Sequence, residues 1–180
     1  MAEVTARVLA ARAKWRFRGL ARPPFADAPG PGEESVWDYP RPPRLARDRR
    51  RVQVSSGDRV LADSTRTVRV LETASPPTFY IPPEDVDETG LQASGRTTFC
   101  EWKGFAQEFD LPDRPGVAWA YVETFPEFRA IAGYFSFYPA RVGCTVGGEV
   151  VRPQPGGYYG GWLTREIVGP VKGEAGSESW

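Results

Sequence analysis

The 180-residue chain contains no histidine and has only two cysteines, Cys100 and Cys144. Histidine is the usual general base near neutral pH and the commonest metal-binding side chain, so its absence removes both roles. Two cysteines are too few for a disulfide framework or for a zinc site built from cysteines alone. Any chemistry must therefore come from Cys, Lys, Tyr, Asp or Glu side chains, and we expect no metal site and no cofactor.

An excess of charge of either sign is also missing, because 23 Lys and Arg side chains balance 23 Asp and Glu side chains. Proteins that bind nucleic acid through its phosphates normally carry a basic excess, so we expect no nucleic-acid partner. The sequence has no apolar run of about 18 residues, the length that suggests a membrane-spanning helix. It has no N-terminal segment that resembles a secretion signal. We therefore expect a cytoplasmic protein with reduced thiols and no membrane partner, and the oligomeric state stays open.

Proline and glycine are plentiful, with 18 and 19 residues, and hydrophobic residues make up 41% of the chain. Short apolar segments between frequent turns favour a mainly β domain with a real core. We divide the chain into three parts by composition. These are residues 1–34, a basic segment that ends in a Pro/Gly linker; residues 35–152, the β domain; and residues 153–180, an extension rich in Gly and Trp.

The N-terminal segment shows helical periodicity, because Val4, Val8, Ala11 and Trp15 recur at the spacing of one helix face. The amphipathic helix would either pack on its own domain, which we favour, or touch an anionic surface. Alternation and turn residues predict the rest. The expected elements are an alternating stretch at 36–39; strands at 51–54, 59–62, 66–73, 79–81, 97–106, 117–122, 134–138, 141–146 and 149–152; a Pro-rich corner at 74–78; and a short helix opened by a capping box at 124–127 and closed by Gly133.

The segment 97–106 concentrates the reactive side chains, because Cys100, Glu101, Trp102 and Lys103 are consecutive. If the segment is a single strand, side chains alternate between its two faces. Cys100 and Trp102 then share one face, and Glu101 and Lys103 share the other. A contact between the thiol and the ammonium would require a bulge, which the following glycine allows.

Four motifs in order resemble a known family. They are Glu72-Thr73-x-x-Pro76-Pro77-x-x-Tyr80, Thr98-x-Cys100-x-Trp102-Lys103-Gly104-x-Ala106, Trp119-x-Tyr121 and Ile131-Ala132-Gly133-Tyr134-x-x-Phe137-Tyr138. From about residue 52 to residue 142, the chain is similar to the bacterial domain of unknown function 427, which is catalogued as nucleotidyltransferase-like. The flanking segments resemble those of long actinobacterial and cyanobacterial members.

The resemblance implies a compact β-tent, similar to peptide methionine sulfoxide reductase B and the thalidomide-binding domain of cereblon. Those relatives usually hold zinc between two cysteine pairs. This chain has no Cys-x-x-Cys, so the zinc site should be absent. The resemblance implies no established reaction. A nucleotidyltransferase would need metal-binding carboxylates, and the sequence has neither their usual motif nor a phosphate-binding glycine loop.

Three side chains are candidates for chemistry. Cys100 is either a nucleophile activated by a nearby cation or a buried structural thiol. Lys103 would bind an anion or act as a base in a pocket, or would be a solvated strand residue. Glu72 could pair with Lys103, act as an acid or base, or form a structural salt bridge. Of the three, we favour Lys103.

Large aromatic residues form a second candidate group. They are either core residues or the lining of a ligand pocket, by analogy with the aromatic cage of cereblon. The candidates are Tyr80, Trp102, Trp119, Tyr121, Phe137 and Tyr138.

Three functions follow from these residues. First, the domain could bind a small molecule, as a binding protein or a cofactor-independent enzyme, with Lys103, Glu72 and Tyr121 as polar anchors. Second, it could be a non-catalytic interaction module that uses the basic N-terminal segment and the Trp-containing extension. Third, it could be a nucleotidyltransferase, as the family label suggests. We rank them in this order.

Overall fold

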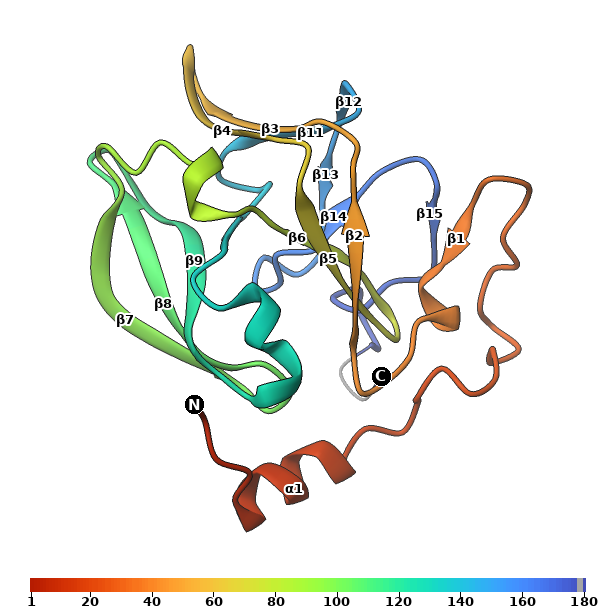
Figure 1. Cartoon of the computed structure of the whole chain (residues 1–180). Coiled ribbons are helices and arrows are strands. Elements are labelled where there is room, and N and C mark those ends of the chain that lie inside the picture. Colours follow the sequence, from red (N-terminus) through yellow and green to blue (C-terminus); the bar gives the residue numbers. More distant parts are fainter. Residues whose placement is uncertain (178–179) are drawn as a thin grey trace.

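Strands dominate the computed structural model, which describes residues 1–177 and 180 (Figure 1). Strands hold 42% of the residues and helices 11%, so the expectation of a mainly β fold is confirmed. Several small sheets are present, with no closed barrel among the described residues. In this part of the chain one helix has seven or more residues, α1 (Ala6–Ala13), which Thr5 caps through its side chain. None of the helices described is long and apolar enough to cross a membrane.

Three sheets make up the body of the protein. The first has the order β10-β9-β8-β7, formed by Phe135–Phe137, Arg114–Thr124, Gly104–Leu111 and Gln92–Cys100. The second has the order β12-β11-β3-β4, formed by Glu149–Val150, Gly143–Val146, Val52–Ser56 and Arg59–Ser64. The third has the order β2-β5-β6, formed by Arg44–Asp48, Thr67–Glu72 and Ser75–Tyr80.

Two strand pairs attach the ends of the chain to this body. The parallel pair joins β1 (Glu34–Ser35) to β15 (Ile167–Val168), and the antiparallel pair joins β13 (Arg152–Pro153) to β14 (Trp162–Leu163). Short 3₁₀ helices complete the described elements. They are η1 (Val36–Asp38), η2 (Pro83–Asp85) and η3 (Pro126–Ile131).

The main core lies between the first and second sheets and includes a residue from the C-terminal extension. Trp162 is fully buried in this core, where its ring lies 5.0 Å from that of Phe79. Its indole nitrogen donates to the main-chain oxygen of Phe137 at 3.0 Å. The expected extension is therefore joined to the central strands by buried apolar surface, the main source of folding free energy.

Both predicted two-residue hairpins are confirmed. Gly57 turns β3 into β4 with φ of 58°, and Gly147 and Gly148 connect β11 to β12 with φ of 58° and 82°. Two consecutive positive φ values, as at Gly147 and Gly148, or one at the first turn position, as at Gly57, match the twist of antiparallel strands, and glycine adopts them without steric cost. Local turn residues were sufficient to locate these connections.

Three other predicted elements are wrong. The alternating stretch at 36–39 contains the 3₁₀ helix η1, whose first turn Ser35 caps by accepting from the Trp37 amide. The predicted corner at 74–78 lies mostly in β6, which tolerates two prolines because it is an edge strand. The expected capping box does not form, since η3 begins after Phe125 without a side-chain cap.

The segment 97–106 is a hairpin rather than one strand. β7 ends at Cys100, residues 101–103 form the turn, and β8 begins at Gly104. Gly104 has φ of 119°, and a Cβ atom there would collide with the main-chain oxygen of Glu123 on β9. The alternating pattern runs through this tight turn, so periodicity alone does not reveal the reversal of direction.

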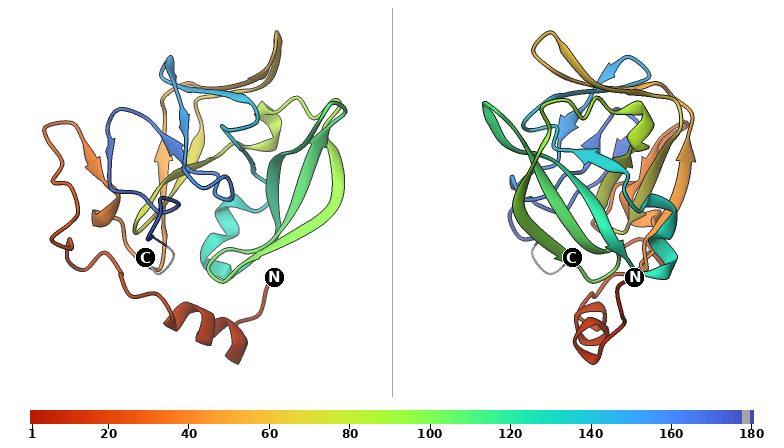
Figure 2. Two further views of the ribbon diagram at one scale, coloured as in Figure 1. Left: turned by 180° about the vertical axis from the view of Figure 1, so that it is seen from behind. Right: turned by 60° about the vertical axis from the view of Figure 1, so that its left-hand side comes forward.

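The N-terminal segment packs on its own domain, as we favoured. Figure 1 and Figure 2 place α1 outside the sheets, at the end of the molecule where β7 turns into β8. The Arg12 guanidinium donates to the main-chain oxygen of Glu101 at 2.7 Å and lies 5.1 Å from the Trp102 ring centroid. Trp15 donates its indole proton to the Glu101 carboxylate at 2.5 Å. The segment therefore covers the hairpin turn that contains the candidate residues.

Candidate functional site

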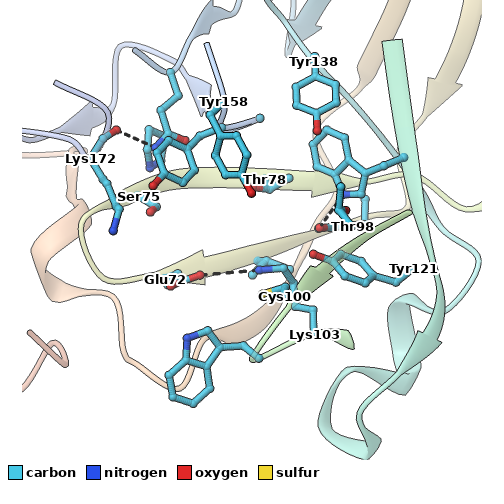
Figure 3. A pocket seen from close by; sticks show the side chains of 18 of the residues that line it. Glu72, Ser75, Thr78, Thr98, Cys100, Lys103, Tyr121, Tyr138, Tyr158 and Lys172 are labelled. Carbon is cyan, nitrogen blue, oxygen red and sulfur yellow. Dashed lines mark hydrogen bonds and ion pairs between the residues drawn. The ribbon is translucent and has the colours of Figure 1, made fainter. Parts of the chain in front are cut away.

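A cavity of about 400 Å³ lies between the hairpins β5–β6 and β7–β8 and the neighbouring strand β9. Its lining includes eight of the nine candidate residues, all except Phe137. In Figure 3 the Tyr121 hydroxyl points toward Cys100 and Lys103, and the hydroxyl ends of Tyr138 and Tyr158 point into the pocket from the opposite side. We call this cavity the aromatic pocket.

At the inner end of the pocket, one carboxylate is shared by two cations. Glu72 closes β5 and lies 3.2 Å from the Arg41 guanidinium and 3.7 Å from the Lys103 ammonium. The Arg41 side chain is fully buried and also donates to the main-chain oxygens of Phe17 and Thr73. Glu72 is therefore held in place from one side, while Lys103 approaches it from the pocket. The expected pairing of Glu72 with Lys103 is present.

Lys103 is almost enclosed, with 13% of its side chain exposed. Burial alone would lower the pKa of this ammonium, but the neighbouring Cys100 and the Glu72 carboxylate outweigh it and raise the pKa above its usual range. The ammonium also lies 5.9 Å from the centre of the Tyr121 ring. Lys103 therefore carries a positive charge at neutral pH, which suits an anion-binding group rather than a general base.

Cys100 and Lys103 lie on the same side of the hairpin, contrary to the prediction from strand alternation. Cys100 is the last residue of β7 and Lys103 is the last residue of the turn, so the reversal of the chain brings both side chains to the pocket. Cys100 is partly buried, and it is one of the neighbours that raise the pKa of Lys103. Cys144 is buried in the main core, where desolvation raises its pKa. Of the two cysteines, therefore, only Cys100 lines the pocket.

Aromatic rings build one wall of the pocket. The Trp119 ring centre lies 4.4 Å from that of Tyr138 and 6.3 Å from that of Tyr80, and Tyr80 lies 6.1 Å from Tyr121. The Trp119 indole donates to the Tyr80 hydroxyl at 3.3 Å. Burial raises the pKa of Tyr80 and of Tyr138 to about 12, and that of Tyr121 well above 10. These phenols stay protonated at neutral pH and serve as hydrogen-bond donors.

Phe137 is the candidate that the structure places elsewhere. It is fully buried in the main core on β10 and does not line the pocket. Tyr138, the next residue in the chain, points the other way and does line it, because successive side chains along an extended strand alternate in direction. Trp102 lines the pocket and is 3% exposed, with its indole nitrogen unpaired among the described residues.

Several pocket residues were missed by the sequence reasoning. Trp15 lies between two cations, 4.4 Å from the Arg41 guanidinium carbon and 3.8 Å from the Lys172 ammonium. Tyr158 and Tyr159 come from the glycine-rich loop 156–161 of the C-terminal extension. In the sequence, a Tyr-Tyr pair stands between two glycine pairs. This pattern indicates a loop with aromatic side chains, but it does not indicate which distant strands the loop contacts.

This loop is held close to the aromatic wall. Gly160 packs so tightly against the Trp119 ring that a Cβ atom would collide with it. Gly161 donates its amide proton to the Gln154 side chain at 3.1 Å, and Gln154 donates in turn to the main-chain oxygen of Lys172 at 2.8 Å. The loop is therefore anchored at its end, and Tyr158, which is 75% exposed, stands at the mouth of the pocket.

Comparison with known proteins gives a family but no activity. Residues 44–148 match the family described as Domain of unknown function (DUF427). The chain belongs to this family. No curated protein matches it. The DUF427 segment supplies Glu72, Cys100, Lys103 and the aromatic wall, whereas Trp15 and the loop 156–161 come from outside it. The DUF427 match thus covers the inner end of the pocket, and the flanking segments complete its lining.

Within the described residues of this DUF427 protein, no group of three or more His, Cys, Asp or Glu side chains could hold a metal ion. The two carboxylates nearest the inner end of the pocket already have partners in the chain. Glu72 pairs with Arg41 and Lys103, and Glu101 accepts from Trp15. These two carboxylates are therefore engaged by side chains of the protein itself.

Proposed function

We propose that this protein binds a small organic molecule in the aromatic pocket. The observation that carries the proposal is the convergence of Lys103, the hydroxyls of Tyr80 and Tyr121, and the Trp119 ring on one cavity of about 400 Å³. Ligand sites are typically concave, largely apolar and provided with a few well-placed polar groups, and this volume lies within their usual range.

The cost of keeping these polar groups at a cavity supports a binding role. Burying an ammonium and several phenols opposes folding unless each group has a partner. If this region had only a structural role, apolar side chains that fill it would stabilise the fold more, as they do in the main core around Phe137 and Trp162. Among the described lining residues the Trp102 indole nitrogen has no hydrogen-bond partner, and a ligand that accepts hydrogen bonds would add partners for the ammonium and the phenols.

Chemistry on a bound ligand would fall to Cys100. Lys103 keeps its proton at neutral pH, and Glu72 is engaged by two cations, so neither is well suited to act as a general base. Cys100 is the half-buried nucleophile beside them. Lys103 and Glu72 then serve as anchors and Cys100 as the reactive group, if the protein is an enzyme.

The two other functions have less support. The interaction module would need the N-terminal segment and the Trp-containing extension to be available, but Trp15, Trp162 and Trp180 all pack against the chain itself. For a nucleotidyltransferase, the pocket carboxylates would have to bind a divalent metal, and Glu72 and Glu101 are already occupied by side chains of the protein.

The proposal is tested with a thermal-shift screen of neutral, cationic and anionic metabolites. Positions 97 and 98 allow a matched pair of variants, because both threonines are exposed but only Thr98 lines the pocket. Thr98→Phe should fill the pocket and abolish stabilisation by a hit, and Thr97→Phe should leave it unchanged. Equal stabilisation of both variants would place the ligand elsewhere, and a screen without any hit would contradict the proposal.

The site of binding is checked by alkylation with N-ethylmaleimide. A ligand in the pocket should slow the modification of Cys100, which lines it. Cys144 is 2% exposed in the main core and serves as the internal reference within the same sample. Equal rates of Cys100 modification with and without a stabilising ligand would show that the pocket is not the binding site.

A further inference from the structure

At the inner end of the aromatic pocket, Lys103 shares its carboxylate partner with a second cation. Arg41 and Lys103 are both cations, and Glu72 is the single carboxylate that pairs with both. The Arg41 side chain is fully buried, and Lys103 is 13% exposed. A buried cation is stabilised by negative charge close to it, so an anion that entered the pocket beside Lys103 would add to the partial neutralisation that the shared carboxylate provides.

Lysine is rare in this chain, and its placement is uneven. The sequence has three lysines, of which Lys103 and Lys172 line the aromatic pocket and Lys14 is exposed at the end of α1. Arginines make the ion pairs elsewhere on the surface, for example Arg51 with Asp63. A lysine ammonium is a compact charge with three donors on a flexible stem, so it can contact the acceptor atoms of a ligand in addition to its partners in the protein.

Several hydrogen-bond donors belong to residues that line the pocket with Lys103. The Tyr80 hydroxyl accepts the indole proton of Trp119, so its own proton is left to donate. Tyr121 adds a second phenol that stays protonated at neutral pH. The Trp102 indole nitrogen has no partner among the described residues. The acceptor that lies closest, Glu72, is already shared by Arg41 and Lys103.

We propose that the ligand is a planar organic anion. Its carboxylate or phosphate group would lie against the Lys103 ammonium and the hydroxyls of Tyr80 and Tyr121, and its ring would lie against Trp119 and Tyr138 (Figure 3). This inference rests on the proposed function and narrows it to one ligand class. Stacking on the aromatic wall fixes the ring, and the charge-assisted contact fixes the acidic end.

Calorimetry with matched pairs of probes tests the anion separately from the ring. The carboxylate arm compares indole-3-acetate with indole-3-acetamide, and the phosphate arm compares phenyl phosphate with phenol. In at least one arm the anion should bind at least tenfold tighter than its neutral partner, as expected for hydrogen bonds to a charged group. The arm with the larger ratio identifies the acidic group.

Two variants assign the preference to a residue. Lys103→Met keeps most of the apolar stem and should remove the preference for the anion, whereas Lys14→Met, at an exposed lysine, should keep it. Cys100→Ala removes the thiol beside the ammonium without changing the Lys103 charge, so anion binding should persist. A ratio near one in the wild type, or an unchanged ratio in Lys103→Met, would overturn the inference.

An experiment on the unaltered protein covers the case in which Lys103→Met does not fold. Inorganic phosphate should compete with indole-3-acetate but not with indole-3-acetamide, because it would occupy only the position of the acidic group. Equal competition against both probes would contradict the assignment. Tight binding of the neutral probes alone would leave the small-molecule function standing and remove the anion, whereas binding of no probe, together with a screen without hits, would remove both.

Discussion

Because Glu72 pairs with two cations, we predict that removing its charge destabilises the protein much more than removing the charge of Lys103. Glu72→Gln removes the counter-charge of Arg41, which is fully buried, and of Lys103, which is 13% exposed. Removing one partner of a buried ion pair costs about 3–5 kcal/mol. Glu72 is 17% exposed and Arg41 keeps two main-chain acceptors, so we expect a loss near the lower limit. A loss of about 3 kcal/mol corresponds to about 6–12 °C in melting temperature for a chain of this size.

Lys103→Met should behave differently, because Arg41 still neutralises Glu72 after the ammonium is gone. The variant also removes a buried charge, so the free energy of unfolding should change by less than about 1 kcal/mol. In the double variant, the loss of Lys103 should restore about 1 kcal/mol of what Glu72→Gln costs, because two uncompensated cations become one.

Urea denaturation at pH 7, followed by tryptophan fluorescence, measures all four proteins. The order of stability should be wild type and Lys103→Met together, then the double variant, then Glu72→Gln. If Lys103→Met lost as much stability as Glu72→Gln, the ammonium would be a required structural partner of Glu72 rather than the dispensable one of its two cations. If the double variant were no more stable than Glu72→Gln, the two cations would not share the carboxylate.

Three further variants test other parts of the structure. Burial raises the pKa of Tyr80 to about 12, so the stability that the neutral phenol maintains below pH 10 should be lost between pH 10 and 12, by at most about 3 kcal/mol. Tyr80→Phe lacks this phenol, so in urea denaturation the difference in free energy of unfolding between the wild type and the variant should become smaller from about pH 10 to about pH 12. An equal loss of stability in both proteins would contradict the raised pKa of Tyr80. Gly104→Ala should cost more than about 2 kcal/mol, because its φ of 119° is unfavourable and its Cβ atom meets the Glu123 oxygen; a wild-type melting temperature would refute the turn geometry. Trp162→Ala should cost about 3–5 kcal/mol, since the ring is fully buried, and a loss below about 1 kcal/mol would show that the extension is not part of the core.

The sequence predicted those parts of the fold that local residues determine. Gly57 and the pair Gly147–Gly148 turn the two confirmed hairpins because their positive φ values are a local property. The turn at 101–103 escaped prediction because hydrophobic alternation continues through it, and only the contact of Gly104 with Glu123 on β9 makes the glycine necessary. That contact joins residues 19 positions apart.

The same distinction holds for the candidate site. The motif residues Glu72, Lys103 and Trp119 do line one pocket, and the resemblance to DUF427 pointed to them without giving their contacts. Trp15 and Tyr158 were missed because they reach the pocket from opposite ends of the sequence, through packing that no local pattern records. Phe137 was misassigned because an aromatic strand residue fits a core and a pocket wall equally well until its direction is known.

The indole protons of the six tryptophans provide the most direct test of the central claim. Trp15, Trp102 and Trp119 line the aromatic pocket, whereas Trp37, Trp162 and Trp180 do not. Their ¹H–¹⁵N resonances can be followed in one NMR titration with the anionic probe that stabilises the protein most. A ligand in the pocket should shift the resonances of the first three, with Trp119 the most, and leave the other three in place. Shifts confined to the other three would contradict the account.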